Sequence, residues 1–215
     1  MSKIKDWEKE PGESIMQKFG DKLHRAPPLK DRINNTIYRL KLQKEKLSQT
    51  GNKMEDRSKE LFDKCIKAQL EKDLTRADIY ANECAQVRKM ATVILQSELA
   101  IEQVIVRLET VEEFGDVVVE MGPIAGVIQK LQRPLAGLVP EVSFELGKIG
   151  GTLNEMVTEA GEVTGRTSDI GASSEESQRI LEDAGAVAEQ KMKERFPDLP
   201  ASAALPAPEK ESTYK

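Results

Sequence analysis

Histidine, which many enzymes use for proton transfer, is nearly absent from this chain. His24 is the only histidine among 215 residues, and no Ser–His–Asp or Cys–His arrangement can be assembled around it. Aromatic residues make up only 4% of the sequence, less than the core of a compact enzyme usually holds. The stretch "GKIGGT" fails the phosphate-loop pattern because Ile149 occupies the Ser/Thr position. We therefore expect no enzyme activity, no cofactor and no metal site.

Cysteine and long apolar runs are also scarce. Cys65 and Cys84 have no metal-ligand spacing and occupy apolar helical positions, so we expect buried free thiols, which fit a reducing cytoplasm. There is no apolar run of the length that a membrane span requires. The start, "MSKIKDWEKEPGES", lacks the apolar core of a secretory signal. The expected location is cytoplasmic.

Charge is abundant and unevenly distributed. Charged residues make up 32% of the chain, and its net charge is −5. Residues 1–96 carry 21 basic and 15 acidic side chains, whereas residues 97–190 carry 6 basic and 18 acidic ones. The basic front and the acidic rear can attract each other within one chain or between neighbouring molecules. Alternatively, the acidic part is simply a solvated surface.

Apolar periodicity predicts an antiparallel helical hairpin. A first helix is expected from Leu29 to Thr50, after Pro27-Pro28, with Gly51-Asn52 as the turn. The run 52–114 holds neither glycine nor proline and predicts a second, much longer arm. Its overhang would be covered by later segments or by other copies. The positions expected to serve helix packing and polymer contacts are Tyr80, Val87, Ile94, Ile101, Ile105 and Leu108.

The rest of the chain is expected to be helical but less regular. Ten of the 14 glycines fall in 115–171, which predicts two short hinged helices, followed by one last helix. The predicted fold class is all-α, a long antiparallel hairpin with shorter C-terminal helices. The expected parts are a flexible amphipathic arm (1–28), a helical core (29–160), a hinge with a C-terminal helix (161–195), and a disordered proline-rich tail (196–215).

The first helix is basic, which favours an anionic membrane surface as a partner, together with an apolar contribution from the arm. The expected membrane-binding residues are Ile4, Trp7, Lys30, Arg32, Arg39, Lys41, Lys44 and Lys46. A merely solvated basic face is the alternative. Compaction of nucleic acid is a third possibility, but no base-reading motif accompanies this helix and the whole chain is acidic, so no nucleic acid is expected.

Three stretches resemble the archaeal ESCRT-III-like cell division proteins, the Cdv B family. They are "PLKDRINNTIYRLKLQ", "DLTRADIYANECAQVRKM" and "SELAIEQVIVRLETV", and the resemblance covers residues 27–160. It implies a helical hairpin with shorter helices behind it. It also implies copies of the chain, with paralogous members, that polymerise at the division site on the inner face of the cell membrane and constrict and sever the neck. The rival hypothesis is a soluble coiled-coil adaptor or scaffold without membrane activity.

The tail "FPDLPASAALPAP" resembles the family's motif for binding the MIT domain of an AAA ATPase. Extended proline-containing segments dock with little loss of conformational entropy. The resemblance implies the anchors Phe196, Pro197, Leu199, Pro200, Leu205 and Pro206. An ordinary Pro/Ala linker is the alternative.

Overall fold

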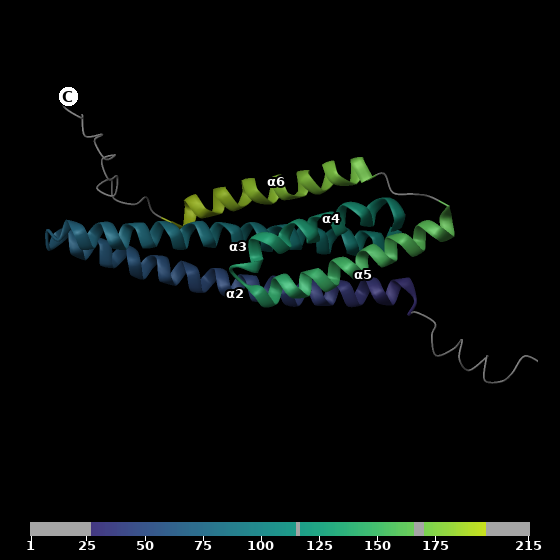
Figure 1. Ribbon diagram of the computed structural model, residues 1–215, viewed down its shortest axis with the longest axis horizontal. Coiled ribbons are helices and arrows are strands. Elements are labelled where there is room, and N and C mark those ends of the chain that lie inside the picture. Colours follow the sequence, from purple (N-terminus) through teal and green to yellow (C-terminus); the bar gives the residue numbers. More distant parts are fainter. Residues whose placement is uncertain (1–26, 115–116, 166–169, 197–215) are drawn as a thin grey trace, which may run out of the picture.

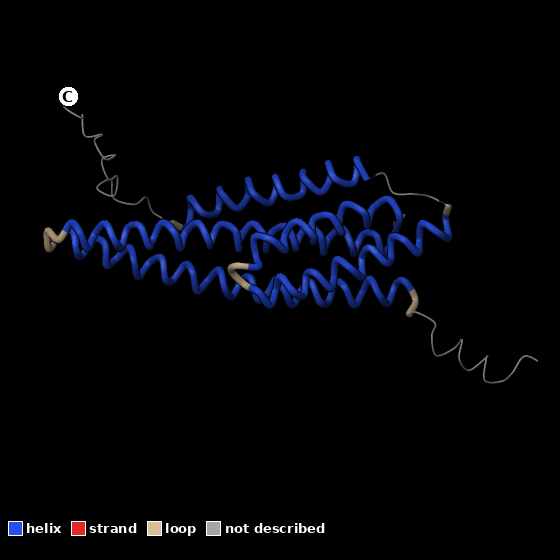
Figure 2. Tube along the Cα trace, in the orientation of Figure 1, coloured by secondary structure: helices blue, strands red, loops and turns tan. Residues whose placement is uncertain are grey.

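The computed structural model describes residues 27–114, 117–165 and 170–196, and within them every regular element is a helix (Figures 1 and 2). The elements in chain order are α2 (Leu29–Leu70), α3 (Leu74–Phe114), α4 (Val117–Ala136), α5 (Pro140–Thr164) and α6 (Ile170–Arg195). The all-α prediction is confirmed. Residues 1–26 of the expected arm lie outside the described residues, and so do residues 197–215 of the expected tail.

Helices α2 and α3 form the long antiparallel hairpin, with 42 and 41 residues. The turn between them is closed by backbone hydrogen bonds from Lys72 N–H to Gln69 O (3.0 Å) and from Asp73 N–H to Ala68 O (2.9 Å). Lys72 takes the left-handed conformation (φ 61°) that usually favours glycine. The Asp73 carboxylate then accepts the backbone N–H of Arg76 at 3.0 Å, which caps the start of α3.

The predicted turn at Gly51-Asn52 was wrong, because Gly51 lies in the middle of α2. A single glycine inside a helix costs about 1 kcal/mol relative to alanine, and burial of flanking side chains such as Leu47 outweighs that cost. A Cβ built on Gly51 would lie 3.6 Å from the side chain of Ile94 in α3. The hairpin arms are therefore nearly equal in length, and the predicted overhang of the second arm does not exist.

Helices α4, α5 and α6 fold back along the hairpin and cover the part away from its tip (Figure 1). Helix α5 packs on α2, whereas α4 and α6 pack on α3. The two helices α4 and α5 occupy the glycine-rich region where two helices were expected. The main core lies where these helices meet, with fully buried side chains that include Leu40, Leu108, Ile128 and Leu146. Near the tip, the hairpin is held by smaller clusters around Cys65 and Cys84, both buried and free as expected.

The docking face of α6 is narrow. Its buried side chains, over the part from residue 174 whose burial the structure describes, are Ser177, Ile180, Ala184 and Ala188. Two hydrogen bonds add to this packing: Ser177 Oγ donates to Pro123 O at 2.8 Å, and Gln96 Nε2 donates to Leu181 O at 3.2 Å. Because small side chains bury little apolar surface, α6 is held more weakly than α5.

Candidate functional site

The basic residues of α2 that were predicted to bind lipid all form ion pairs within the chain. They do so with glutamates of two different helices, which divides them into two groups. The α3-facing stripe consists of Lys30, Lys41 and Lys44, and the α5-facing stripe consists of Arg32, Arg39 and Lys46. The sequence showed the charge of this helix but not which neighbour each residue meets.

The α3-facing stripe joins the two arms of the hairpin. Lys30 Nζ lies 3.4 Å from a carboxylate oxygen of Glu112. Further along α2, Lys41 lies 2.8 Å from Glu109 and Lys44 lies 3.3 Å from Glu102. Lys30 and Lys41 remain 70% and 55% exposed, so these are surface pairs of small energetic value.

Two members of the α5-facing stripe, Arg32 and Arg39, are more enclosed than the α3-facing lysines, whereas Lys46 is 48% exposed. Arg32 pairs with Glu159 and, at 3.9 Å, with Glu155. Arg39 meets Glu145 at 3.1 Å, and Lys46 meets Glu141 at 3.7 Å. The exposed fractions of the Arg32 and Arg39 side chains are only 13% and 26%. Hydrogen bonds from Lys148 and from Arg39 hold the pKa of Glu145 below its ordinary value, which keeps that carboxylate charged.

The residues predicted to serve packing and polymer contacts lie inside the chain. Ile94, Ile101, Ile105 and Leu108 belong to the main core. Val87 packs with Leu61 and Cys84, and the partly buried Tyr80 packs against both small clusters. Because packing within the chain covers this seam of α3, its buried apolar side chains are not available to another copy in this conformation.

The end of α6 is anchored on the hairpin by an aromatic and charged contact. The ring of Phe196, which is partly buried, lies 5.3 Å from the guanidinium carbon of Arg88 in α3. Arg88 also lies 5.7 Å from the ring of Phe62 in α2, and its Nε donates to Ser58 Oγ at 3.1 Å. Such cation–π contacts contribute about 0.5–1 kcal/mol each at exposed sites. No sequence pattern indicated this anchor, because its members come from α2, from α3 and from the residue that follows α6.

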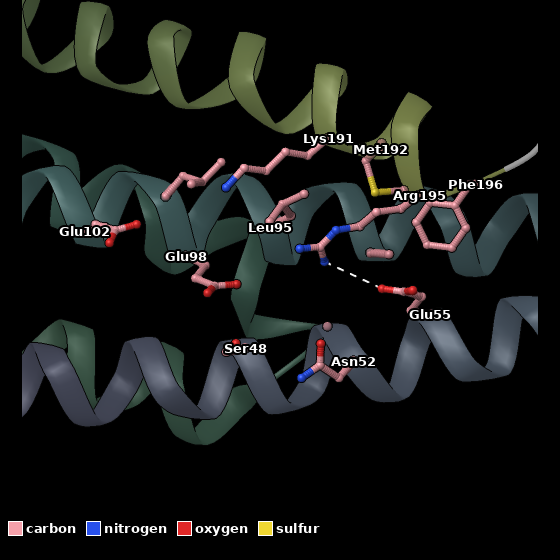
Figure 3. Close-up of a pocket in the computed structure, with 13 residues that line it drawn as sticks. Ser48, Asn52, Glu55, Leu95, Glu98, Glu102, Lys191, Met192, Arg195 and Phe196 are labelled. Atoms are coloured by element: carbon pink, nitrogen blue, oxygen red, sulfur yellow. Dashed lines mark ion pairs between the residues drawn. The ribbon is translucent and has the colours of Figure 1, made fainter.

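A small groove of about 90 Å³ lies beside this anchor, between α2, α3 and the end of α6 (Figure 3). Arg195 crosses it to Glu55 at 3.6 Å, and Glu98 points into it from α3. Burial raises the pKa of Glu98, although a hydrogen bond with Ser48 acts in the opposite direction. Charged side chains from the hairpin and from α6 therefore face each other across this groove.

The remaining predicted contact residues lie outside the described residues. These are Ile4, Trp7, Pro197, Leu199, Pro200, Leu205 and Pro206. Over the described ranges, none of the helices combines the length and the apolar character that crossing a membrane demands. The same ranges hold no group of three or more His, Cys, Asp or Glu residues that could hold a metal ion.

Two characterised proteins are similar to this chain over most of its length. Cell division protein B1 of Sulfolobus acidocaldarius is 44% identical over 175 residues, which cover 81% of this chain and 82% of that protein. Cell division protein B of the same organism is 33% identical over 182 residues, which cover 85% of this chain and 70% of that protein. Neither a protein-family model nor a solved structure matches the chain.

Proposed function

Because this chain belongs to the archaeal Cdv B family of cell division proteins, we propose that it acts in cell division as a filament-forming, membrane-remodelling protein. It works at the inner face of the cell membrane, at the division site. There it assembles with copies of itself and with paralogous members of the family, and the assembly constricts and severs the neck.

The observation that carries this proposal is the covering of a basic helix by an acidic one. Arg39 and Lys46 of α2 meet Glu145 and Glu141 of α5, and the acidic helix is joined to the rest by a short connection, residues 137–139. Ion pairs of this kind are individually weak and are screened by salt, so they can be exchanged for other partners. The folded-back chain is thus a closed form, and release of α5 and α6 gives an open form.

The open form supplies what a filament needs. Release of α5 opens the main core, which holds fully buried apolar side chains such as Leu40 of α2 and Leu146 of α5 in the closed form. Such surfaces are driven to pair with those of another copy. Each copy binds anionic lipid weakly through a few charges, and a polymer binds it strongly through many copies.

The tail supplies the contact with an MIT-domain AAA ATPase, through Phe196 and the proline-rich segment after it. In the closed form Phe196 is anchored against Arg88. A partner that binds the tail at Phe196 competes with this anchor and favours the open form.

The test is electron microscopy and co-sedimentation of the purified full-length chain with vesicles. We expect filaments and pelleting on vesicles of phosphatidylcholine mixed with phosphatidylserine, and neither on phosphatidylcholine alone. A chain that stays unassembled on both kinds of vesicle would contradict the proposal.

One observation favours the rival function, a soluble coiled-coil scaffold: every predicted lipid-binding residue of α2 is already paired within the chain. Under that hypothesis the closed form is the working form, and anionic vesicles change neither the sedimentation nor the exposure of α5. The vesicle experiment therefore separates the two functions.

A further inference from the structure

The outward side of α2 carries a row of exposed residues at helical spacing. Within the described part of the chain, α2 packs only on α3 and α5. Arg39 pairs with α5 and Lys41 pairs with α3, so the row that lies between these two directions faces away from both helices. We call it the outer row, and its members, all exposed and alternately four and three residues apart, are Asp31, Asn35, Tyr38, Leu42, Glu45 and Gln49.

The middle of the outer row is apolar and is flanked by acidic residues. Tyr38 and Leu42 lie one helical turn apart and are 62% and 45% exposed. Asp31 forms no ion pair among the described residues, and Glu45 accepts a hydrogen bond from Gln49 of the same row at 3.0 Å. A helix whose apolar stripe is bordered by basic residues would complement this row in both polarity and charge.

The segment just before α2, which lies outside the described residues, has that pattern. Residues 14–25 read "SIMQKFGDKLHR". Ser14 and Gln17 have the spacing of a capping box, and Pro27 with Pro28 would end a helix on the other side. In such a helix one side is apolar and the side next to it is basic. The apolar set is Ile15, Met16, Phe19 and Leu23, and the basic set is Lys18, Lys22 and Arg25.

The connection to α2 sets the direction and the register of the fit. Only three residues separate segment 14–25 from the start of α2, a length that joins antiparallel helices. A helix of the segment would be about 16 Å long, which the outer row, about 27 Å long, accommodates. Counting equal numbers of residues back and forward from the connection places Met16 level with Tyr38. The same count places Lys22 within one residue of the level of Asp31.

We propose that residues 14–25 form a short helix that packs antiparallel on the outer row of α2, with Met16 and Phe19 against Tyr38 and Leu42. The tether favours this segment over a second copy as the occupant, because a short linker gives an effective concentration in the millimolar range. The contact forms within one chain. The inference therefore goes beyond the proposed membrane function and does not depend on it.

Hydrogen exchange of the full-length chain, without vesicles, measures whether the amides of residues 14–25 are protected. Tyr38→Ser with Leu42→Ser removes the apolar middle of the outer row. The matched control is Ile79→Ser with Val106→Ser, which removes two apolar residues of α3 that are each 56% exposed. Circular dichroism of both variants checks that the described helices are intact.

We expect the segment to be protected in the unmodified chain and to exchange on the order of tenfold faster in the first variant, because the docked helix loses its apolar contacts. The control should leave its exchange unchanged. Exchange of the segment at the rate of an unfolded chain in the unmodified protein would overturn the inference, and so would equal acceleration in both variants.

Protection that rises with protein concentration would also overturn the inference, because it would assign the outer row to a second copy. Vesicle binding is a separate measurement. Its failure would refute the proposed membrane function and leave this contact within the chain intact.

A charge exchange tests the register without changing the apolar residues. Lys22→Glu brings a second acidic group close to Asp31, so it should speed exchange in the segment. Adding Asp31→Lys should restore protection, whereas adding Asp63→Lys, at an exposed position of α2 nearer the hairpin tip, should not. Restoration by both second substitutions, or by neither, would contradict the antiparallel packing and with it the inference.

Discussion

Replacing Gly126 by alanine tests how α6 is held against α4. A Cβ at this position would lie 2.5 Å from Ser177 Oγ and 3.3 Å from Ser177 Cβ, both closer than normal contact. The Ser177 hydroxyl must turn away or α6 must move outward. Either response breaks the 2.8 Å hydrogen bond from Ser177 Oγ to Pro123 O, which is buried. The substitution should therefore loosen α6 while leaving the α2–α3 hairpin unchanged.

The magnitude follows from two opposing effects. Alanine is favoured over glycine inside a helix by about 1 kcal/mol. Loss of a buried hydrogen bond costs about 1–3 kcal/mol. Gly151 in α5 is the matched control, because it also lies inside a helix but a Cβ there would meet nothing within 4 Å. The helix preference cancels in the comparison, so Gly126→Ala should be less stable than Gly151→Ala by about 1–3 kcal/mol.

Urea unfolding of the two variants measures this difference, and hydrogen exchange of the α6 amides locates it. In a double variant with Ser177→Ala the clashing oxygen is gone, so the cost of Gly126→Ala should fall. The reasoning fails if Gly126→Ala stabilises the chain as much as Gly151→Ala does and leaves α6 exchange unaltered.

Three further predictions concern the core, one carboxyl group and the thiols. Leu146→Ala, at a fully buried position of α5, should lower the free energy of unfolding in urea by about 2–5 kcal/mol, whereas a loss below 1 kcal/mol would show that α5 is not packed as described. Burial raises the pKa of Glu98, so the folded chain binds this proton more tightly than the unfolded chain, and the stability it contributes falls as pH rises from the ordinary pKa to the raised one. Glu98→Gln should therefore gain stability relative to the unmodified chain as pH rises through that interval, and a pH-independent difference in urea unfolding would contradict this. Cys65 and Cys84 are fully buried, and burial raises the pKa of the Cys65 thiol, so a thiol reagent should label both only in urea; fast labelling of the folded chain would refute their burial.

Most of the helical content was predictable because it depends on local patterns. Apolar periodicity and the glycine distribution indicated α4, α5 and one long helix over 52–114, which the structure divides between the end of α2 and all of α3. The apolar positions of that run indicated the buried seam of α3. The buried thiols were predictable for the same reason, since Cys65 and Cys84 fall on apolar helical positions.

The position of the hairpin turn was not predictable from turn residues. Gly51 is the residue that local preference selects for a turn, yet α2 continues through it because its neighbours are buried against α3. The actual turn uses Lys72 in a left-handed conformation, which local preference disfavours. Asp73, as an N-cap for α3, was the one available signal.

The sequence by itself determined that this chain is a set of long charged helices, with a basic front, an acidic rear and the family motifs, because each of these depends on residues close together in the chain. Only the tertiary structure decided which charges meet. Residues 32 and 44 are both basic residues of one helix, but Arg32 faces Glu159 of α5 and Lys44 faces Glu102 of α3. That choice depends on how the helices pack, because an ion pair forms between side chains that packing brings within a few ångströms, however far apart they lie in the chain.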